Sequence, residues 1–290
     1  MRARRALIVV ALLAILGAGC DWPNITPSGA APVRYRDQVF VDGSGNPNVT
    51  VTSNVKFGSA VDNGGHTVNL LYDEYSPTGD ANTSRPAIVW IHGGSFCCGD
   101  KTSVEIVDEA KHFAGEGYLG FSISYRLEPD GCNSVTATCV IAIKEAAADA
   151  QTAVAYVRSH AAALGVDPTR IAVAGTSAGA ITALNLAYSS SEAPAATKVR
   201  AAVSLSGAHL VVGTVSAGDA PALDFHGTSD PLVPYSWAQT TESDAQAAGL
   251  DFFLETFPGA GHVPYQFRTQ ILTQSSNFLY WEMDLAHAAQ

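Results

Sequence analysis

Short apolar runs bounded by turn-forming residues recur along most of the chain. They have the length and flanking residues of strands that are buried inside a parallel sheet. The runs that predict such strands are residues 86–92, 119–125, 170–175, 199–206, 221–227 and 251–257. Upstream, residues 49–57 and 66–75 predict an early β-hairpin or meander.

Stretches with apolar residues at helical spacing lie between and after these runs. They are residues 102–117, 140–165, 178–190, 235–249 and the tail from Pro264. The alternation of strand and helix predicts an α/β fold with a mainly parallel sheet and helices on both faces. Periodicity does not give the strand order. We see neither an internal repeat nor a second domain.

The composition indicates a large hydrophobic core and argues against a nucleic-acid partner. The chain has 290 residues, of which 47% are hydrophobic and 15% are charged, so it can bury a large core. The formal net charge of −11 argues against a nucleic-acid partner, which would require a basic face.

The first 19 residues have the pattern of a secretory signal peptide. Three arginines precede an apolar run, Ala6–Gly19, that is short for a membrane span. The sequence LGAGC is similar to a bacterial lipobox with Cys20 as the lipidated residue, although Gly17 stands where leucine is usual. We therefore expect an exported protein, and a cell-envelope lipoprotein held to the membrane by its lipid rather than a freely secreted one. An uncleaved N-terminal anchor is the alternative.

The segment after the signal is rich in Pro, Gly, Asn and Ser. It predicts a flexible tether over residues 20–48, followed by one catalytic domain over residues 49–290.

Export favours disulfides for the four remaining cysteines, Cys97, Cys98, Cys132 and Cys139. Three connectivities are open. A local bridge between Cys132 and Cys139 is favoured over one that joins the two cysteine-bearing loops. No spacing of Cys and His indicates zinc, and no metal is expected.

Ser177 lies in the pattern Gly-x-Ser-x-Gly, between a predicted strand and a predicted helix. A nucleophile elbow has a strained backbone at the serine and leaves no room for side chains two residues on either side. Alone, the pattern also fits an ordinary turn of small residues.

A second motif, HGGSF at residues 92–96, directly follows a predicted strand. Its glycines, Gly93 and Gly94, leave amide groups unobstructed for an oxyanion hole, to which Ala178 N–H would add a third donor. An ordinary glycine turn is the alternative. His92 is interpreted as a structural hydrogen-bonding residue.

Two loops after later strands supply an acid and a base. Asp230 lies in HGTSDPLVP and His262 in PGAGHVPY. The order Ser177, Asp230, His262 is that of the α/β-hydrolase triad. His262 would take the proton of Ser177, and Asp230 would orient the imidazole. The rival acids and bases are Asp219, Asp224, Glu255, His209 and His226.

Taken together, HGGSF…GDK, YRL, DPTRIAVAGTSAGA, HGTSDPLVP and GAGH resemble the α/β-hydrolase superfamily. The resemblance covers about residues 50–290 and points to its carboxylesterase and acetyl-esterase-like members, which include the hormone-sensitive-lipase type. That family usually has a third glycine where this chain has Ser95, and no cysteine at positions 97 and 98.

The resemblance implies a serine carboxylic ester hydrolase that forms an acyl-serine and needs no cofactor. The interval from Ser206 to Pro221 is too short for a large lid or cap, so we expect an open site. A serine peptidase on the same fold and a non-catalytic surface binding module are the alternatives. The expected substrate is a small or polymer-borne ester of unspecified type. The aromatic residues that could line its pocket are Phe96, Tyr125, Trp237 and Tyr265.

Overall fold

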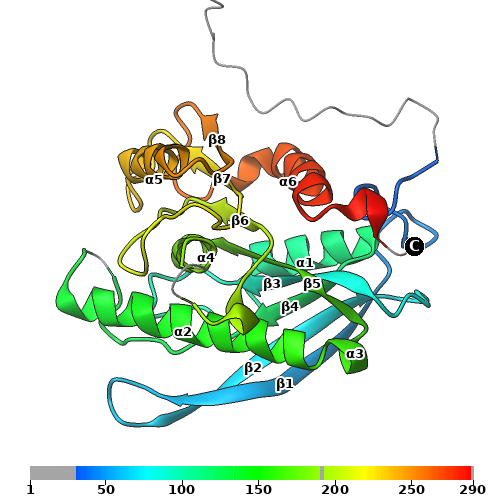
Figure 1. Cartoon of the computed structure of the whole chain (residues 1–290), viewed down its shortest axis with the longest axis horizontal. Coiled ribbons are helices and arrows are strands. Elements are labelled where there is room, and N and C mark those ends of the chain that lie inside the picture. The colour runs from blue at the N-terminus through cyan, green and yellow to red at the C-terminus, as the bar shows by residue number, and fades with distance from the viewer. Residues whose placement is uncertain (1–30, 133, 190–192, 289–290) are drawn as a thin grey trace, which may run out of the picture.

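The computed structural model describes residues 31–132, 134–189 and 193–288. Over these residues the chain forms an eight-stranded sheet in the order β1-β2-β4-β3-β5-β6-β7-β8 (Figure 1). The strands are β1 Val49–Val61, β2 Thr67–Pro77, β3 Arg85–Ile91, β4 Leu119–Ile123, β5 Val166–Thr176, β6 Ala202–Leu205, β7 Ala222–Gly227 and β8 Phe252–Phe257. The helices are α1 Val104–Glu116, α2 Ala137–Ser159, α3 Ala161–Leu164, α4 Ala178–Ala187, α5 Tyr235–Ala247 and α6 Arg268–Glu282, with short 3-10 turns η1 Ala195–Thr197, η2 Tyr265–Phe267 and η3 Leu285–His287.

The pairing of the strands confirms the predicted α/β architecture. Six neighbouring strands of the sheet are parallel to one another, in the order β4, β3, β5, β6, β7 and β8. The predicted hairpin is β1 and β2, which pair antiparallel and join the sheet through an antiparallel pairing of β2 with β4. This hairpin forms one edge of the sheet, where Figure 1 shows β1 and β2 side by side.

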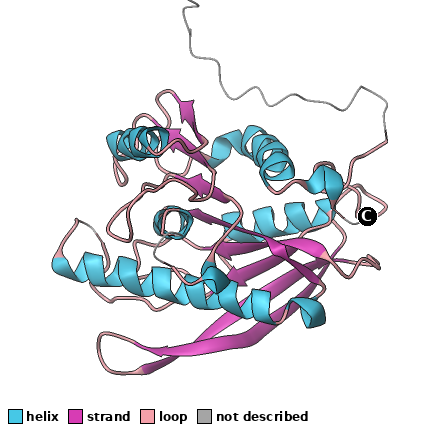
Figure 2. Ribbon diagram, in the orientation of Figure 1, coloured by secondary structure: helices cyan, strands magenta, loops and turns pink. Residues whose placement is uncertain are grey.

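Helices cover both faces of the sheet (Figure 2). One hydrophobic core lies between the sheet and α2, α4 and α5 and includes Ile143, Leu184 and Ala245. The other core lies between the sheet and α1 and α6 and includes Phe113 and Phe278. The central strands are therefore buried on both faces, which explains why their sequences are continuous apolar runs.

The predicted helix at residues 140–165 is two helices in the structure. α2 begins three residues earlier, at Ala137, because the Thr136 hydroxyl caps it by accepting a hydrogen bond from Cys139 N at 3.2 Å. α2 ends before His160, and the short α3 ends at Gly165, whose φ of 70° suits a glycine cap.

The prediction of a flexible tether is wrong for the described residues 33–48. Tyr35 is 1% exposed, its amide donates to Glu116 O at 2.7 Å, and its carbonyl accepts from Tyr118 Oη at 2.9 Å. Val39 N also donates to Gly115 O. The polar composition hid these contacts, which join the segment to the end of α1. Residues 1–30, with the predicted signal and Cys20, lie outside the described residues.

The parallel register brings the carboxyl ends of five strands side by side. Ile91 pairs with Gly175, Thr176 with Leu205, and Gly227 with Phe257. The loops that follow β3, β5, β7 and β8 carry HGGSF, Ser177, Asp230 and His262, so the strand order itself gathers them at one edge. The segment between β6 and β7 is a loop without a helix, as expected for a site with no lid inserted there. In the part of the chain that the structure describes, no helix has both the length and the apolar character to cross a membrane.

Candidate active site

Ser177 occupies a strained turn between β5 and α4. Its φ of 55° and ψ of −118° lie outside the regions that most side chains adopt, as in a nucleophile elbow. The flanking glycines allow this turn to pack against β3. A Cβ at Gly175 would lie 2.7 Å from Ile91 O, and one at Gly179 would overlap the same carbonyl. The Gly-x-Ser-x-Gly spacing is therefore required by the close approach of two backbones.

The structure brings Ser177, His262 and Asp230 into one chain of hydrogen bonds. Ser177 Oγ lies 2.7 Å from His262 Nε2, and His262 Nδ1 lies 2.8 Å from Asp230 Oδ2. An ionised carboxylate can only accept, so Nδ1 carries the ring proton and Nε2 is left to accept from the serine hydroxyl. This arrangement is the one that a serine nucleophile with a histidine base requires.

Asp230 remains ionised because of the groups that surround its carboxylate. Burial would raise its pKa, but hydrogen bonds from His262 and from the amides of Leu232 and Val233 outweigh burial and lower the pKa to about 2. The two amides donate to Oδ1 at 2.9 and 3.0 Å, which leaves Oδ2 for the imidazole. The loop backbone thus fixes both the charge and the orientation of this side chain.

Backbone contacts hold the loop with His262 against the loop with Asp230. Ser229 N donates to Ala260 O at 2.9 Å. A side chain at Gly227 would overlap the carbonyls of Ala260 and Gly261. On the other side of His262, Val263 N donates to the buried Ser206 Oγ at 2.9 Å. The histidine therefore sits between two anchored neighbours.

The HGGSF turn lies directly beside Ser177. A Cβ at Gly93 would be 3.1 Å from Ser177 Cβ. Gly94 has a φ of 118° and Ser95 a φ of 51°, so this serine takes a left-handed conformation that glycine adopts more easily. Among the described residues, the amides of Gly94 and Ala178 donate to no protein acceptor, which leaves both able to bind an oxyanion.

Ser177 borders two cavities of different character. The first, of about 130 Å³, is lined largely by apolar groups. The second, of about 350 Å³, is more open and contains Gly94, Glu105 and His262. Leu232, which is 65% exposed, lines both and lies at the boundary. The apolar groups of the first cavity include Phe96, Ile143, Ile181, Val233 and Trp237.

Two of the four predicted pocket aromatics are elsewhere. Phe96 and Trp237 line the apolar cavity, but Tyr125 and Tyr265 line neither cavity beside Ser177. Tyr125 is buried, and its hydroxyl donates to His92 O at 3.0 Å. The Tyr265 hydroxyl donates to Asp108 at 2.6 Å and so points toward α1. Both tyrosines brace the scaffold.

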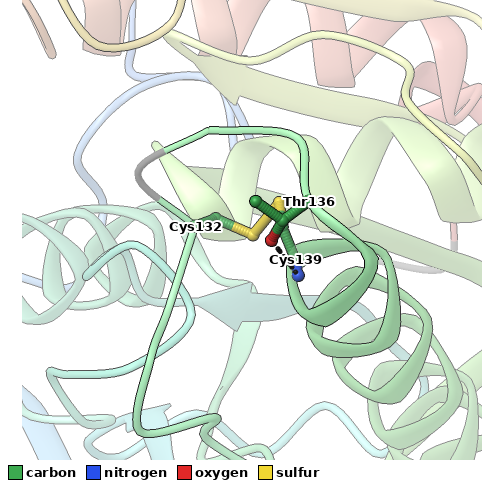
Figure 3. Close-up of a disulfide and its surroundings, with 3 residues drawn as sticks. All are labelled: Cys132, Thr136 and Cys139. Atoms are coloured by element: carbon green, nitrogen blue, oxygen red, sulfur yellow. Dashed lines mark hydrogen bonds between the residues drawn. A yellow bond between two sulfur atoms is a disulfide. The ribbon is translucent and has the colours of Figure 1, made fainter.

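The favoured disulfide, Cys132–Cys139, is present in the structure and lines the apolar cavity. Figure 3 shows it at the start of α2, next to the capping Thr136. It fixes the loop after β4 to the helix that forms this wall of the cavity. Cys97 and Cys98 are free thiols in the structure.

Behind Asp230 and His262 lies a buried pair, His226 and Asp224, that the sequence did not indicate as part of the site. His226 Nδ1 donates to Asp224 Oδ2 at 3.0 Å and Nε2 donates to Val233 O at 2.9 Å, so both ring nitrogens face acceptors. Nε2 also lies 3.5 Å from Asp230 Oδ2. Burial would lower the pKa of His226, but Asp224, Val233 and Asp230 together raise it. The signal was available, since residues two apart in a strand share a face.

The other rival acids and bases have partners away from Ser177. His209 Nε2 lies 2.7 Å from Val212 O, Glu255 accepts from Gln270, and Asp219 accepts from the amide of Ser216. His92 Nδ1 contacts Gly93 O at 2.7 Å beneath the glycine turn, in agreement with a structural role. No cluster of three or more His, Cys, Asp or Glu residues suited to a metal ion is found among the described residues.

A strained serine at the end of a parallel strand, with its histidine and acid on later strand loops, is the arrangement of an α/β-hydrolase. The BD-FAE family model matches residues 72–211. Lipase 2 of Moraxella sp. (strain TA144) is 28% identical over 144 residues, and phenmedipham hydrolase of Pseudarthrobacter oxydans is 34% identical over 119 residues. These alignments cover 49% and 41% of the chain, but only 30% and 23% of the two relatives.

Solved structures are similar to this chain over a larger share of its length. The native structure of Est2, a thermophilic esterase of Thermogutta terrifontis, is 27% identical with a TM-score of 0.62 and covers 81% of this chain and 92% of its own. Its butyrate-bound structure is also 27% identical, with a TM-score of 0.61 and coverage of 80% and 94%. Its paraoxon-phosphorylated form is 25% identical, with a TM-score of 0.65 and coverage of 89% and 100%. The chain therefore has the α/β-hydrolase fold and is similar in structure to this esterase.

Proposed function

We propose that this protein is a serine esterase that hydrolyses short-chain carboxylic esters through an acyl-Ser177 intermediate. The observation that carries the proposal is the hydrogen-bond chain from Ser177 through His262 to Asp230, beside two amides without protein acceptors. A hydroxyl, a neutral imidazole and an ionised carboxylate in this order supply a nucleophile, a base and an orienting group.

Each proton in the reaction has a place to go. Ser177 Oγ attacks the ester carbonyl while its proton passes to His262 Nε2. The amides of Gly94 and Ala178, with Gly93 as the further candidate donor, stabilise the oxyanion. When the tetrahedral intermediate collapses, His262 gives the proton to the departing alcohol and the acyl group remains on Ser177. Water then attacks the acyl-enzyme by the same steps, releasing the carboxylic acid and restoring the serine.

The two cavities suggest how the substrate lies. The acyl chain occupies the apolar cavity that Ile181 and Trp237 help to line, because an alkyl group gains most by leaving water there. The alcohol faces the open cavity beside His262, from which it can depart. The bound butyrate of the esterase Est2, and propionate in a further structure of that protein, support a short acyl chain.

The test compares Ser177→Ala with Ser243→Ala, a matched change at an exposed serine of α5. We expect Ser177→Ala to lower turnover of p-nitrophenyl butyrate by about 10⁴-fold or more and to abolish labelling by a fluorophosphonate probe. Ser243→Ala should match the wild type in both. Turnover or labelling that persists in folded Ser177→Ala would exclude this nucleophile.

Adding peptide amide substrates to this experiment distinguishes the two alternative functions. A serine peptidase would cleave peptide amides in preference to esters and would still label at Ser177. A non-catalytic binding module would fold but neither label nor turn over. Ester hydrolysis is favoured because Est2, whose solved structures are similar to this chain, is an esterase.

We also propose that the protein is exported, as the N-terminal pattern predicts. The Cys132–Cys139 disulfide supports this, since such bonds persist mainly in oxidising compartments. Fractionation of cells that express the wild type and Cys20→Ala tests it. Release of only the variant into the medium would indicate a lipid anchor, and a cytoplasmic wild type would contradict export.

A further inference from the structure

The two free thiols, Cys97 and Cys98, lie in a tight turn directly after the HGGSF motif. Their Sγ atoms are 2.7 Å apart, well inside the separation of two sulfur atoms in ordinary contact. A disulfide bond is about 2.0 Å long, so only a small movement separates the pair from bonding distance. Neighbouring cysteines have no need to approach this closely, because their side chains can point apart.

Among the four cysteines that the structure describes, the pairing of the other two leaves Cys97 and Cys98 as each other's partner. Four cysteines allow three pairings, and the structure contains Cys132–Cys139. An environment that oxidises that pair would also act on Cys98, which is exposed. We propose that Cys97 and Cys98 form a second disulfide, between adjacent residues, and that this bond braces the turn that carries the candidate oxyanion donor Gly94.

The bond forms by thiol–disulfide exchange with a small disulfide, for which oxidised glutathione serves as the probe. The exposed Cys98 thiolate attacks one sulfur of the oxidant, giving a mixed disulfide and one released thiol. The Cys97 thiolate then attacks Cys98 Sγ and displaces the second thiol. The two cysteines lose two electrons and two protons, and the oxidant gains them as two thiols.

The brace acts on Gly94 through short contacts. The amides of Cys97 and Cys98 both donate to Gly94 O at 3.0 Å, and Cys97 Sγ lies 3.4 Å from the same oxygen. A Cβ at Gly94 would overlap Cys98 O, which shows how closely the cysteine turn covers the glycine. The disulfide would close a ring that includes the Cys97–Cys98 peptide bond. This ring would restrict the backbone of the two cysteines, whose amides bond to Gly94 O, and so hold Gly94 in place.

The cysteine turn is also held from its other side. Cys132 N donates to Ser95 O at 2.8 Å, and Glu128 N donates to Phe96 O at 2.9 Å. A Cβ at Gly131 would lie 3.1 Å from Cys97 Sγ. The loop that carries Cys132 thus packs against the Cys97 thiol. The two disulfides would therefore stiffen adjoining walls of the site.

Peptide mapping of the wild-type protein tests the bond directly. The protein is equilibrated with a glutathione redox buffer, and its free thiols are alkylated. It is then digested, and the masses of the peptides are measured without reduction. We expect the peptide with Cys97 and Cys98 to escape alkylation and to be two hydrogen atoms lighter than the dithiol form. Alkylation of both thiols while Cys132–Cys139 stays intact, or a bond from either one to Cys132 or Cys139, would overturn the proposal.

Kinetics test the brace, which rests on the proposed esterase function. Relative to the oxidised wild type, the double variant Cys97→Ser/Cys98→Ser should have a kcat lower by about 2- to 10-fold, less than the ~10²-fold that loss of a whole donor costs. Its KM should be unchanged. The kcat of the wild type should follow the glutathione ratio, and that of the double variant should not. Equal kcat values in oxidised wild type and double variant would refute the brace. If the esterase proposal itself fails, no form turns over, while mapping still reports the bond.

Discussion

Replacing Asp230 by asparagine should disable the enzyme by reversing the proton positions on His262. Asp230 Oδ1 accepts hydrogen bonds from two backbone amides, while Oδ2 faces His262 Nδ1 at 2.8 Å. In Asp230→Asn the amide oxygen keeps the place at the two N–H groups, because an NH₂ group cannot accept from them. The NH₂ group then faces Nδ1, which must give up its proton. The ring proton moves to Nε2, where it blocks proton transfer from Ser177.

The expected loss follows from that reversal. A wrong histidine tautomer in an otherwise intact triad lowers kcat by about 10⁴-fold, or about 5 kcal/mol of transition-state stabilisation. The effect on stability should be smaller. The Asp230 pKa, lowered to about 2, corresponds to about 2 kcal/mol of folding free energy at neutral pH. Catalysis should therefore suffer much more than folding.

The assay measures kcat and KM for p-nitrophenyl butyrate, with thermal unfolding to verify the fold. Asp219→Asn makes the same chemical change at a carboxylate that accepts from Ser216 N, and it should stay within about threefold of the wild type, as expected away from a catalytic site. The reasoning would be refuted if folded Asp230→Asn kept more than a tenth of wild-type kcat. A larger loss in Asp224→Asn would instead make that residue, through His226, the orienting acid.

Three further changes test other parts of the structure. Gly179→Ala should lower the free energy of unfolding by about 3 kcal/mol or more in urea titrations, because the new Cβ would overlap Ile91 O, whereas Gly43→Ala, with open space around its Cβ, should cost less than about 1 kcal/mol. The His226 pKa is raised, so the stability it contributes is complete below its ordinary value of about 6.5 and is lost as pH rises through the folded value; His226→Gln should abolish this decline in unfolding free energy with rising pH, and an unchanged decline would assign it to another group. Ile181→Phe should reduce the volume of the apolar cavity and lower kcat/KM for butyrate at least about tenfold relative to acetate esters; an equal effect on both would place the acyl chain elsewhere.

The features that the sequence predicted well are those with local signals. Strand ends are marked by Gly, Pro and Asp, and a parallel sheet gathers such ends at one edge. The motif order then placed Asp230 and His262 on loops that the structure does bring to Ser177. Their catalytic roles stay predictions until the variants are measured.

The features that the sequence did not predict depend on contacts between distant residues. Tyr125 follows β4 and was a reasonable pocket residue until the structure placed its hydroxyl on His92 O. Tyr35 lies in a polar segment, yet it is buried, and its backbone is held by Glu116 O and the Tyr118 hydroxyl at the C-terminal end of α1. Neither contact leaves a periodic pattern in the sequence, because one partner alone carries no information about the other. The sequence does not determine the order of the strands in the sheet for the same reason.

Close contacts between backbone segments largely set the geometry of the site. These contacts explain why certain positions have no side chain. Gly175 and Gly179 allow β5 and α4 to meet β3, and Gly227 allows the loop with His262 to meet the loop with Asp230. Ser95 has a left-handed backbone with a φ of 51°. Such a conformation is costly for a serine, so the surrounding contacts must hold it. The amides of Cys97 and Cys98 bonded to Gly94 O, and of Cys132 bonded to Ser95 O, are those contacts. The backbone of three cysteines thus holds the turn in which Ser95 takes a conformation that favours glycine.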